Sequence, residues 1–191
     1  MRKIIIGIAG EIVSGKDTVT HYLENRYGAR IFFLSDPLRD VLDRLHLAQT
    51  RENLTRVSGA IRTEFGDNIL SHSIASDAAN DPPSFVVIDG VRRQSDIEAV
   101  KELPEFSLLY VEADIKTRYE RIVRRRQNAD DETKTFEDFQ KDHLLETEIG
   151  ISALRSEARF IINNDGSLED LYSQVDDIVA ELQKEANESH Q

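Results

Sequence analysis

Short runs of apolar, β-branched residues alternate along the chain with segments whose apolar residues fall at helical spacing. Strand-like runs lie at 3–9, 30–34, 85–88, 107–111 and 159–162. The intervening segments predict helices at 16–26, 37–46, 51–65, 67–79, 94–102, 115–126, from Thr135, and 167–185. Such alternation is typical of a parallel sheet covered by helices on both faces. The pattern predicts an α/β fold with a doubly wound, five-stranded parallel sheet.

The length of 191 residues suits one domain with a hydrophobic core. We expect this domain to span 1–183, with the polar stretch 184–191 as a flexible tail. No run reaches the ~18–20 apolar residues of a membrane span, and the first residues lack the features of a signal peptide. A cytoplasmic protein without a membrane partner is the simplest expectation.

Composition removes several classes of site. Cysteine is absent, which excludes disulfides, thiolate catalysis and cysteine-based zinc sites. The five histidines show no metal-ligand spacing. A net charge of −12 argues against a nucleic-acid partner, which usually requires a basic face.

The segment after the first predicted strand matches a phosphate-binding loop. It fits G-x-x-x-x-G-K, with Asp where Ser or Thr is usual and Thr one position later. Glycines let successive N–H groups point inward, and the following helix adds its positive end. A chance match is the alternative, but the motif lies between a predicted strand and a predicted helix, as such a loop requires. We expect nucleotide phosphates to be bound by Gly10, Val13, Ser14, Gly15, Lys16, Asp17 and Thr18.

Within this loop, Lys16 supplies a mobile cation for the β- and γ-phosphates. Asp17 replaces a hydroxyl that ordinarily binds Mg²⁺, so it either ligates the metal itself or caps the helix. Asp89 follows an apolar strand, where a carboxylate could hold Mg²⁺ through water or bind substrate. Its alternative is a simple Asp-Gly turn. Asp17 and Asp89 are the predicted metal ligands.

Several segments resemble P-loop nucleotide and nucleoside kinases. The Gly-Lys-Asp-Thr ending of the loop is similar to that of some deoxynucleoside monophosphate kinases, and to the Gly-Lys-Gly-Thr of adenylate kinases. Residues 86–93 (VVIDGVRR) resemble the Asp-Gly-x-x-Arg strand end of nucleoside monophosphate kinases, and 35–39 (SDPLR) the acceptor side of deoxynucleotide kinases. Residues 159–168 resemble the C-terminal part of dephospho-CoA kinases.

This resemblance covers most of the chain and has structural and chemical implications. It implies the P-loop kinase fold with a small helical lid at about 118–150 and an acceptor-binding helical region at about 37–80. It also implies ATP and Mg²⁺ as cofactors.

Four arginines are candidates for binding an acceptor phosphate. Arg92 or Arg93, directly after the third predicted strand, could clamp it bidentately; the alternative is two solvated arginines at a helix start. Arg39 and Arg62 could do the same from the following helices, or lie on the surface.

Asp36 distinguishes two kinds of acceptor. It stands where dephospho-CoA kinases keep an aspartate. A hydroxyl acceptor benefits from a carboxylate that takes its proton, whereas a phosphate acceptor needs no base. The alternative role for Asp36 is to cap the helix that begins with Pro37.

The segment 118–126 holds five arginines in nine positions. On a helix, Arg118, Arg121 and Arg125 share one face. This resembles a kinase lid, which makes Arg121 and Arg125 candidates for stabilising the transferring phosphoryl group. A solvated face paired with acidic neighbours and an RNA-binding patch are the alternatives.

The polar sequence after the last predicted strand is a candidate for the adenine site. In the resembling kinases this loop approaches adenine, so Asn164 is expected to contact it; a strand-to-helix turn is the alternative. The aromatic residues Tyr22, Phe32, Phe33 and Phe65 are expected in the core rather than stacked on a base.

Together these features predict an ATP- and Mg²⁺-dependent kinase acting on a nucleotide-like small molecule, with dephospho-CoA-like acceptors favoured. A nucleoside or deoxynucleoside monophosphate kinase is the alternative within this class. A nucleotide-binding switch protein is the alternative outside it, although the guanine-type Asn-Lys-x-Asp motif is absent. The sequence leaves the oligomeric state open.

Overall fold

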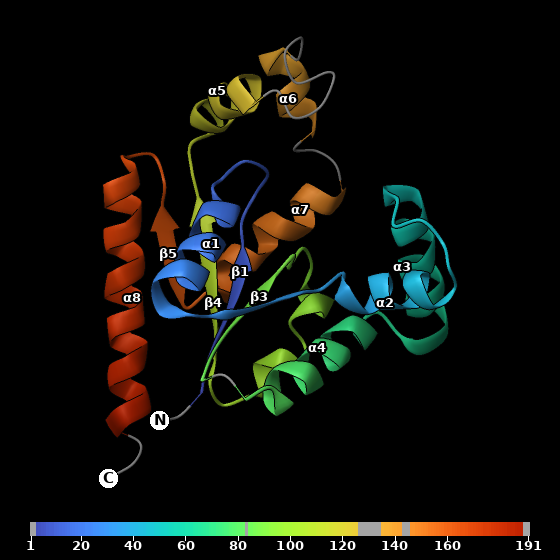
Figure 1. The fold of residues 1–191 in the computed structure, drawn as a ribbon. Coiled ribbons are helices and arrows are strands. Elements are labelled where there is room, and N and C mark those ends of the chain that lie inside the picture. The colour runs from blue at the N-terminus through green and yellow to red at the C-terminus, as the bar shows by residue number, and fades with distance from the viewer. Residues whose placement is uncertain (1–2, 83, 126–134, 143–145, 189–191) are drawn as a thin grey trace.

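A computed structural model describes residues 3–82, 84–125, 135–142 and 146–188, which fold around one parallel sheet (Figure 1). Its strands follow the order β2-β3-β1-β4-β5. Their bounds are β1 Ile4–Ala9, β2 Arg30–Phe33, β3 Phe85–Asp89, β4 Phe106–Glu112 and β5 Phe160–Asn163. The order reverses on either side of β1, so the predicted doubly wound, five-stranded sheet is confirmed.

Helices connect the strands, as the apolar pattern predicts. Their bounds are α1 Lys16–Tyr27, α2 Asp36–Arg44, α3 Arg51–Phe65, α4 Ile69–Asn80, α5 Ile115–Arg125, α6 Phe136–Asp142, α7 Glu146–Ala153 and α8 Leu168–Glu188. Thr135 caps α6, because its hydroxyl accepts from the Asp138 amide and donates to the Asp138 carboxylate. Residues 126–134 and 143–145 of the predicted lid lie outside the described residues.

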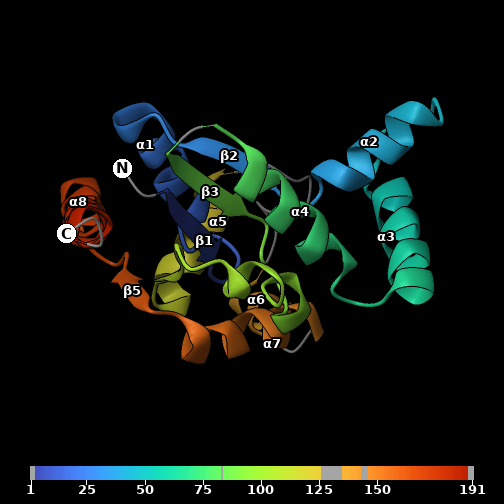
Figure 2. The ribbon, with the colours of Figure 1, turned by 90° about the horizontal axis from the view of Figure 1, so that it is seen from below.

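The sheet separates two apolar layers because successive strand side chains point to opposite faces. Ile5 of β1 packs in the layer beneath α4 and α7, whereas Ile4 and Ile6 pack against α1 and α8. The view from below shows these helices on opposite sides of the sheet (Figure 2). The same view shows α2 and α3 projecting away from α8. All carboxyl strand ends therefore lie at one edge between two helical layers.

Three local predictions are wrong. The helix expected at 94–102 is two short 3₁₀ turns, Gln94–Asp96 and Val100–Glu102. The Asp96 carboxylate accepts hydrogen bonds from the amides of Arg92 and Arg93 at the start of the first turn. The amides of Ala99 and Val100 donate to the Ser71 hydroxyl, so they are not available to continue a helix. The expected tail is helical as far as Glu188, since α8 continues beyond its last buried residue, Leu182.

The third wrong prediction concerns the aromatic residues. Phe65 is 71% exposed and Phe33 is 42% exposed, so neither belongs to the core. Phe65 is the last residue of α3, a helix that buries none of its residues. Within the described residues, no helix is both long and apolar enough to cross a membrane.

Candidate functional site

The phosphate loop joins β1 to α1 and has the backbone that its glycines predict. Gly10 and Gly15 have φ values of 150° and 105°. A Cβ on Gly10 would collide with the Val111 carbonyl, and one on Gly15 would collide with the Asn164 amide. Val13 is held at φ 59°, a conformation that β-branched residues rarely adopt and that is typical of functional loops. The loop is a tight cradle fixed by its neighbours.

The polar side chains of the loop are arranged for an anion. Lys16 lies back across the loop, with Nζ 3.0 Å from the Glu11 carbonyl oxygen. Ser14 is fully buried, and its hydroxyl has no hydrogen-bond partner among the described residues. Thr18 is half-buried at the start of α1, and Asp17 is exposed. Buried polar groups are normally paired, so the Ser14 hydroxyl is a donor that a phosphate oxygen could use.

Asn164 ties the loop to α5. Its side-chain amide donates to the Ser14 carbonyl at 2.7 Å, and its own carbonyl accepts from Arg121 Nη2 at 2.7 Å. Asn164 is 7% exposed. Its amide nitrogen therefore supports the phosphate loop, and the adenine contact of Asn164 stays a prediction. The backbone of Arg125 lies in α5, but its side chain lies outside the described part of the chain.

The same β5–α8 loop holds an acidic group. Burial raises the pKa of Asp165, but hydrogen bonds from the Asp114 amide and the Asn163 side chain outweigh this effect. The pKa of Asp165 therefore lies below its ordinary value. This charged carboxylate anchors the start of α5, the helix that carries Arg121.

Arg118 joins the base of α5 to the phosphate loop. Its guanidinium lies 3.0 Å from the Glu11 carboxylate, and Nε donates to the Ala113 carbonyl. The other Glu11 oxygen accepts from the Ser152 hydroxyl of α7. Burial, with the Glu11 charge adding, raises the pKa of Tyr110 to about 12. Glu11 would repel phosphates if left alone, and Arg118 neutralises it.

Two terminal guanidinium nitrogens at the base of α5 are buried without partners among the described residues: Arg118 Nη1 and Arg121 Nη1. Arg118 is 3% exposed, so the alternative of a solvated arginine face does not describe this end of the helix. Unpaired buried donors cost about 1–3 kcal/mol each. Like the Ser14 hydroxyl, each is a donor of the kind that phosphate oxygens accept.

Asp89 ends β3 and is 7% exposed. Its Oδ2 accepts from the Thr20 hydroxyl at 2.9 Å, and Oδ1 accepts from the Gly90 amide. No cation among the described residues pairs with it. The described residues contain no group of three or more His, Cys, Asp or Glu that could hold a metal. Any metal here would depend on Asp89, Asp17 and oxygens from outside the chain.

Asp36 lies at the carboxyl end of β2, on the acceptor side of the site. Its Oδ2 accepts from the Phe33 amide at 2.7 Å. Ser35 occupies the N-cap position of α2 and Asp36 is its first residue, so the alternative of Asp36 as helix cap is wrong. Arg39 follows one turn later and donates to Gln49 at 2.8 Å. The turn thus holds the Asp36 carboxylate at the edge of the sheet.

Arg62 and Asp96 connect α3 to the loop after β3. Arg62 Nη2 lies 2.7 Å from Asp96 Oδ1, and the two side chains are only 10% and 4% exposed. Arg62 is therefore not a surface residue, and its charge is already paired. Arg92 and Arg93 are exposed, with no side-chain hydrogen bond or ion pair to the described residues. Of the predicted acceptor arginines, these two are free to bind a ligand.

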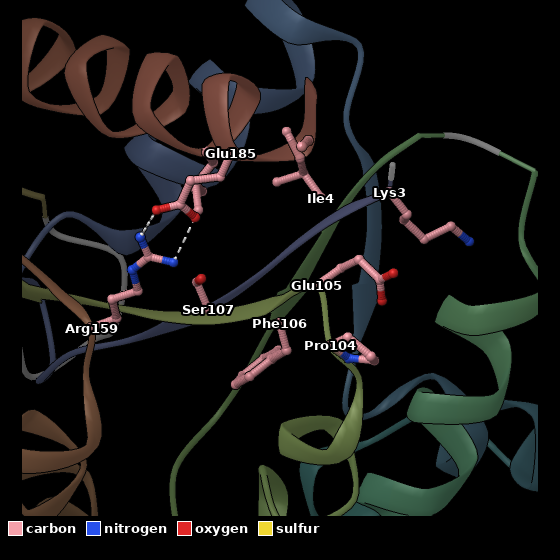
Figure 3. A pocket seen from close by; sticks show the side chains of 10 residues that line it. Lys3, Ile4, Pro104, Glu105, Phe106, Ser107, Arg159 and Glu185 are labelled. Atoms are coloured by element: carbon pink, nitrogen blue, oxygen red, sulfur yellow. Dashed lines mark hydrogen bonds and ion pairs between the residues drawn. The ribbon is translucent and has the colours of Figure 1, made fainter. Parts of the chain in front are cut away.

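A pocket of about 110 Å³ lies at the opposite edge of the sheet, at the amino ends of β1 and β4 (Figure 3). Its Arg159 pairs with Glu185 and Glu181. Its Lys3 donates to the carbonyls of Ala78 and Asp81, which end and follow α4. Both cations are satisfied within the protein, so the pocket does not compete with the phosphate loop as a phosphate site.

Comparison with known proteins places the chain in a family. Residues 6–143 match the AAA domain family. A UPF0200 protein of Hyperthermus butylicus is 30% identical over 94% of this chain and 95% of its own length. A UPF0200 protein of Pyrobaculum aerophilum is 31% identical over 93% of this chain and 98% of its own. The chain belongs to the UPF0200 family and carries an AAA domain.

Solved structures share the fold of this UPF0200 chain at low sequence identity. Shikimate kinase from Bacteroides thetaiotaomicron superposes with a TM-score of 0.60 at 14% identity, covering 94% of this chain and 98% of its own. Dephospho-CoA kinase from Campylobacter jejuni gives 0.56 at 17% identity, covering 94% and 97%. These neighbours show that the UPF0200 chain has the P-loop kinase fold.

Four residues of the site were not singled out by sequence reasoning: Glu11, Thr20, Asp96 and, as a buried group, Arg118. The sequence gives only a weak indication that Thr20 and Asp96 are functional: each is a polar residue in a segment that also supplies core residues. Glu11 stood inside the motif but at a variable position. Its pairing with Arg118, which is 107 positions away, is a consequence of topology that spacing does not reveal.

Proposed function

We propose that the chain is a kinase that transfers the γ-phosphoryl group of ATP, with Mg²⁺, to a nucleotide-like small molecule. The observation that carries this proposal is the loop at residues 10–18, whose glycine backbone suits phosphates and whose Ser14 hydroxyl is a donor unpaired among the described residues. The low-identity kinase neighbours support the class of reaction but not the acceptor. ATP with Mg²⁺, when bound, supplies the phosphoryl group and a divalent charge.

The residues of the chain have separate tasks in this proposal. Lys16 and the loop amides bind the phosphates, and Asp89 with Asp17 supplies oxygen ligands for the metal. Arg121 stabilises the negative charge that spreads over the transferring group, and Arg118 offsets the charge of Glu11 beside the loop. The protein forms no covalent bond to the phosphoryl group in such a transfer, so positioning and charge account for catalysis.

Asp36 favours a hydroxyl acceptor, as in dephospho-CoA. One of its oxygens is fixed by the Phe33 amide, and the other has no hydrogen bond to the described residues. A fixed carboxylate with a free oxygen is what proton abstraction from a hydroxyl requires. A monophosphate acceptor is the second candidate, because Arg92 and Arg93 are exposed and unpaired as a phosphate clamp would be.

The test is a coupled ADP-release assay with Mg·ATP. Acceptors would include dephospho-CoA, each common nucleoside and deoxynucleoside monophosphate, and a blank without acceptor. We expect one acceptor to stimulate ADP release, with its phosphorylated product found by mass spectrometry. A panel that stays at the level of the blank, with nucleotide binding confirmed, would contradict the proposal and favour a nucleotide switch.

Asp36→Asn separates the two kinds of acceptor. With a hydroxyl acceptor we expect the turnover rate to fall at least about 100-fold, because the base is lost. Mg·ATP affinity should not change, since Asp36 lies at β2 and not in the phosphate loop. Asp40→Asn, an exposed carboxylate one turn further along α2, is the matched control. Near-normal turnover of Asp36→Asn would reject the base and favour a phosphate acceptor.

A further inference from the structure

The Asp89 carboxylate is buried without a counter-charge. It is 7% exposed and accepts one hydrogen bond on each oxygen, from the Thr20 hydroxyl and the Gly90 amide. It makes no ion pair with the described residues. A buried carboxylate is costly unless it pairs with a cation or coordinates a metal. Each oxygen keeps one lone pair that neither donor uses, so Asp89 can still bind a cation.

Thr20 holds this carboxylate from the neighbouring helix. It is 1% exposed in α1 and lies between the core residues Val19 and Leu23. An apolar residue would fit such a position, and a buried hydroxyl costs free energy unless it is bonded. The hydroxyl is bonded to Asp89, across 69 residues of sequence. The Thr20 hydroxyl therefore holds the Asp89 carboxylate in a fixed orientation.

Asp17 lies one turn before Thr20 on the same side of α1, because residues three apart share a helix face. It is exposed, at the end of the helix next to the phosphate loop. In the usual loop pattern this position carries a hydroxyl that binds Mg²⁺. In this chain the same face of α1 carries the Asp17 carboxylate at the usual metal position. One turn later it carries the Thr20 hydroxyl, which contacts Asp89.

We propose that Thr20 is the positioning residue of a Mg²⁺ site formed by Asp17 and Asp89. This inference rests on the proposed nucleotide function. Thr20 donates to one oxygen of Asp89 and so fixes the direction of its remaining lone pairs. The Asp17 carboxylate then replaces the usual hydroxyl as a direct ligand, and the divalent charge offsets the two carboxylates. Partners that orient metal ligands in this way typically contribute 10–100-fold to metal affinity.

The test compares Thr20→Val with Thr20→Ser by calorimetry and electron paramagnetic resonance. Calorimetry measures the binding of a non-hydrolysable ATP analogue, once in the presence of Mg²⁺ and once in EDTA. Electron paramagnetic resonance counts the Mn²⁺ ions bound at saturating analogue. We expect Thr20→Val to raise the half-saturating metal concentration at least about 10-fold, with affinity in EDTA unchanged. Thr20→Ser keeps the donor and should titrate like the wild type. Thr20→Ala gives the same comparison if valine impairs folding.

Two results would overturn the inference while leaving the kinase proposal intact. One is a Thr20→Val protein whose metal dependence equals that of the wild type. The other is an equal loss of affinity with Mg²⁺ and in EDTA, which would place the effect in the phosphate loop. A wild-type protein that binds no nucleotide under either condition would instead overturn both the proposed function and this inference.

Discussion

The two sides of the candidate site are built differently. The phosphate side is fixed from several directions, because Asn164, Arg118 and Thr20 each connect the loop or its helix to another element. The α2–α3 hairpin, residues 36–65, projects from the sheet (Figure 2). Helix α3 buries no residue completely, and α2 buries only Leu38 and Leu42. The phosphate loop is thus tied to the fold on several sides, whereas the hairpin proposed to bind the acceptor has few buried residues.

This difference fits the ligands that the proposed function assigns to the two sides. Phosphate and metal are the same in every such transfer, so their donors can be fixed in advance at little cost. An acceptor must enter and leave, and regions that move are drawn from the parts of a fold with few buried contacts. The Arg62–Asp96 ion pair is the main buried polar tie between α3 and the sheet-edge loops. Substitutions on the two sides should therefore have different signatures.

The largest effect is expected on the phosphate side, from Lys16→Met. Loss of this cation should lower kcat by about 100- to 1,000-fold, as removal of a preorganised charge-stabilising donor does. The rate is measured with whichever acceptor the ADP-release assay identifies. Lys184→Met, on the exposed face of α8, is the matched control. A Lys16→Met enzyme with ordinary kcat would separate the loop from catalysis.

A smaller effect is expected when the loop loses its tie to α5. Arg118→Met leaves the Glu11 carboxylate uncompensated, and should lower the free energy of unfolding by about 3 kcal/mol in urea titrations. Glu11→Gln combined with Arg118→Met should recover part of this loss. Arg124→Met is the control, because its pair with Glu120 is exposed on the same helix. Equal stability of the two single arginine variants would contradict a structural role for the buried pair.

The smallest effects are expected on the acceptor side, where substitutions of the buried Arg62 and the exposed Arg92 can be compared. Arg62→Ala leaves buried Asp96 unpaired and should lower the free energy of unfolding by about 2 kcal/mol. Arg92→Ala removes an exposed, unpaired guanidinium, so stability should change by less than about 0.5 kcal/mol. Its effect should be a several-fold rise in acceptor KM. Reversed signatures would mean that Arg62, not Arg92, contacts the acceptor.

The sequence predicts the fold well because its signals are local. Apolar runs such as 85–88 are almost sufficient to place a strand buried on both faces, and Gly10 and Gly15 mark a loop whose backbone only glycine permits. The helix predicted at 94–102 is interrupted because the Ser71 hydroxyl accepts from the amides of Ala99 and Val100, which a continuous helix would bond within itself. Ser71 comes from α4, a different helix.

The sequence predicts which residues belong to the candidate site, but not which residues they contact. Asp89 and Arg121 were expected at the site, yet nothing near them in sequence indicated the Thr20 hydroxyl or the Asn164 carbonyl. These contacts arise where parallel strands bring distant segments to one edge. The sequence likewise predicted an acceptor role for Arg62, although the structure pairs it with Asp96. Local sequence patterns therefore indicate which side chains have suitable chemistry. The topology of the fold decides which of them are already paired and which can bind a ligand.

The most direct test of the central claim is a crystal structure of the protein grown with Mg·ADP. The account predicts the β-phosphate within residues 10–18, contacted by Lys16 and the loop amides, with the metal beside Asp89. It also predicts that the Ser14 hydroxyl gains a partner. Nucleotide bound only in the Arg159 pocket at the other edge of the sheet, or a phosphate loop left empty at saturating Mg·ADP, would contradict it.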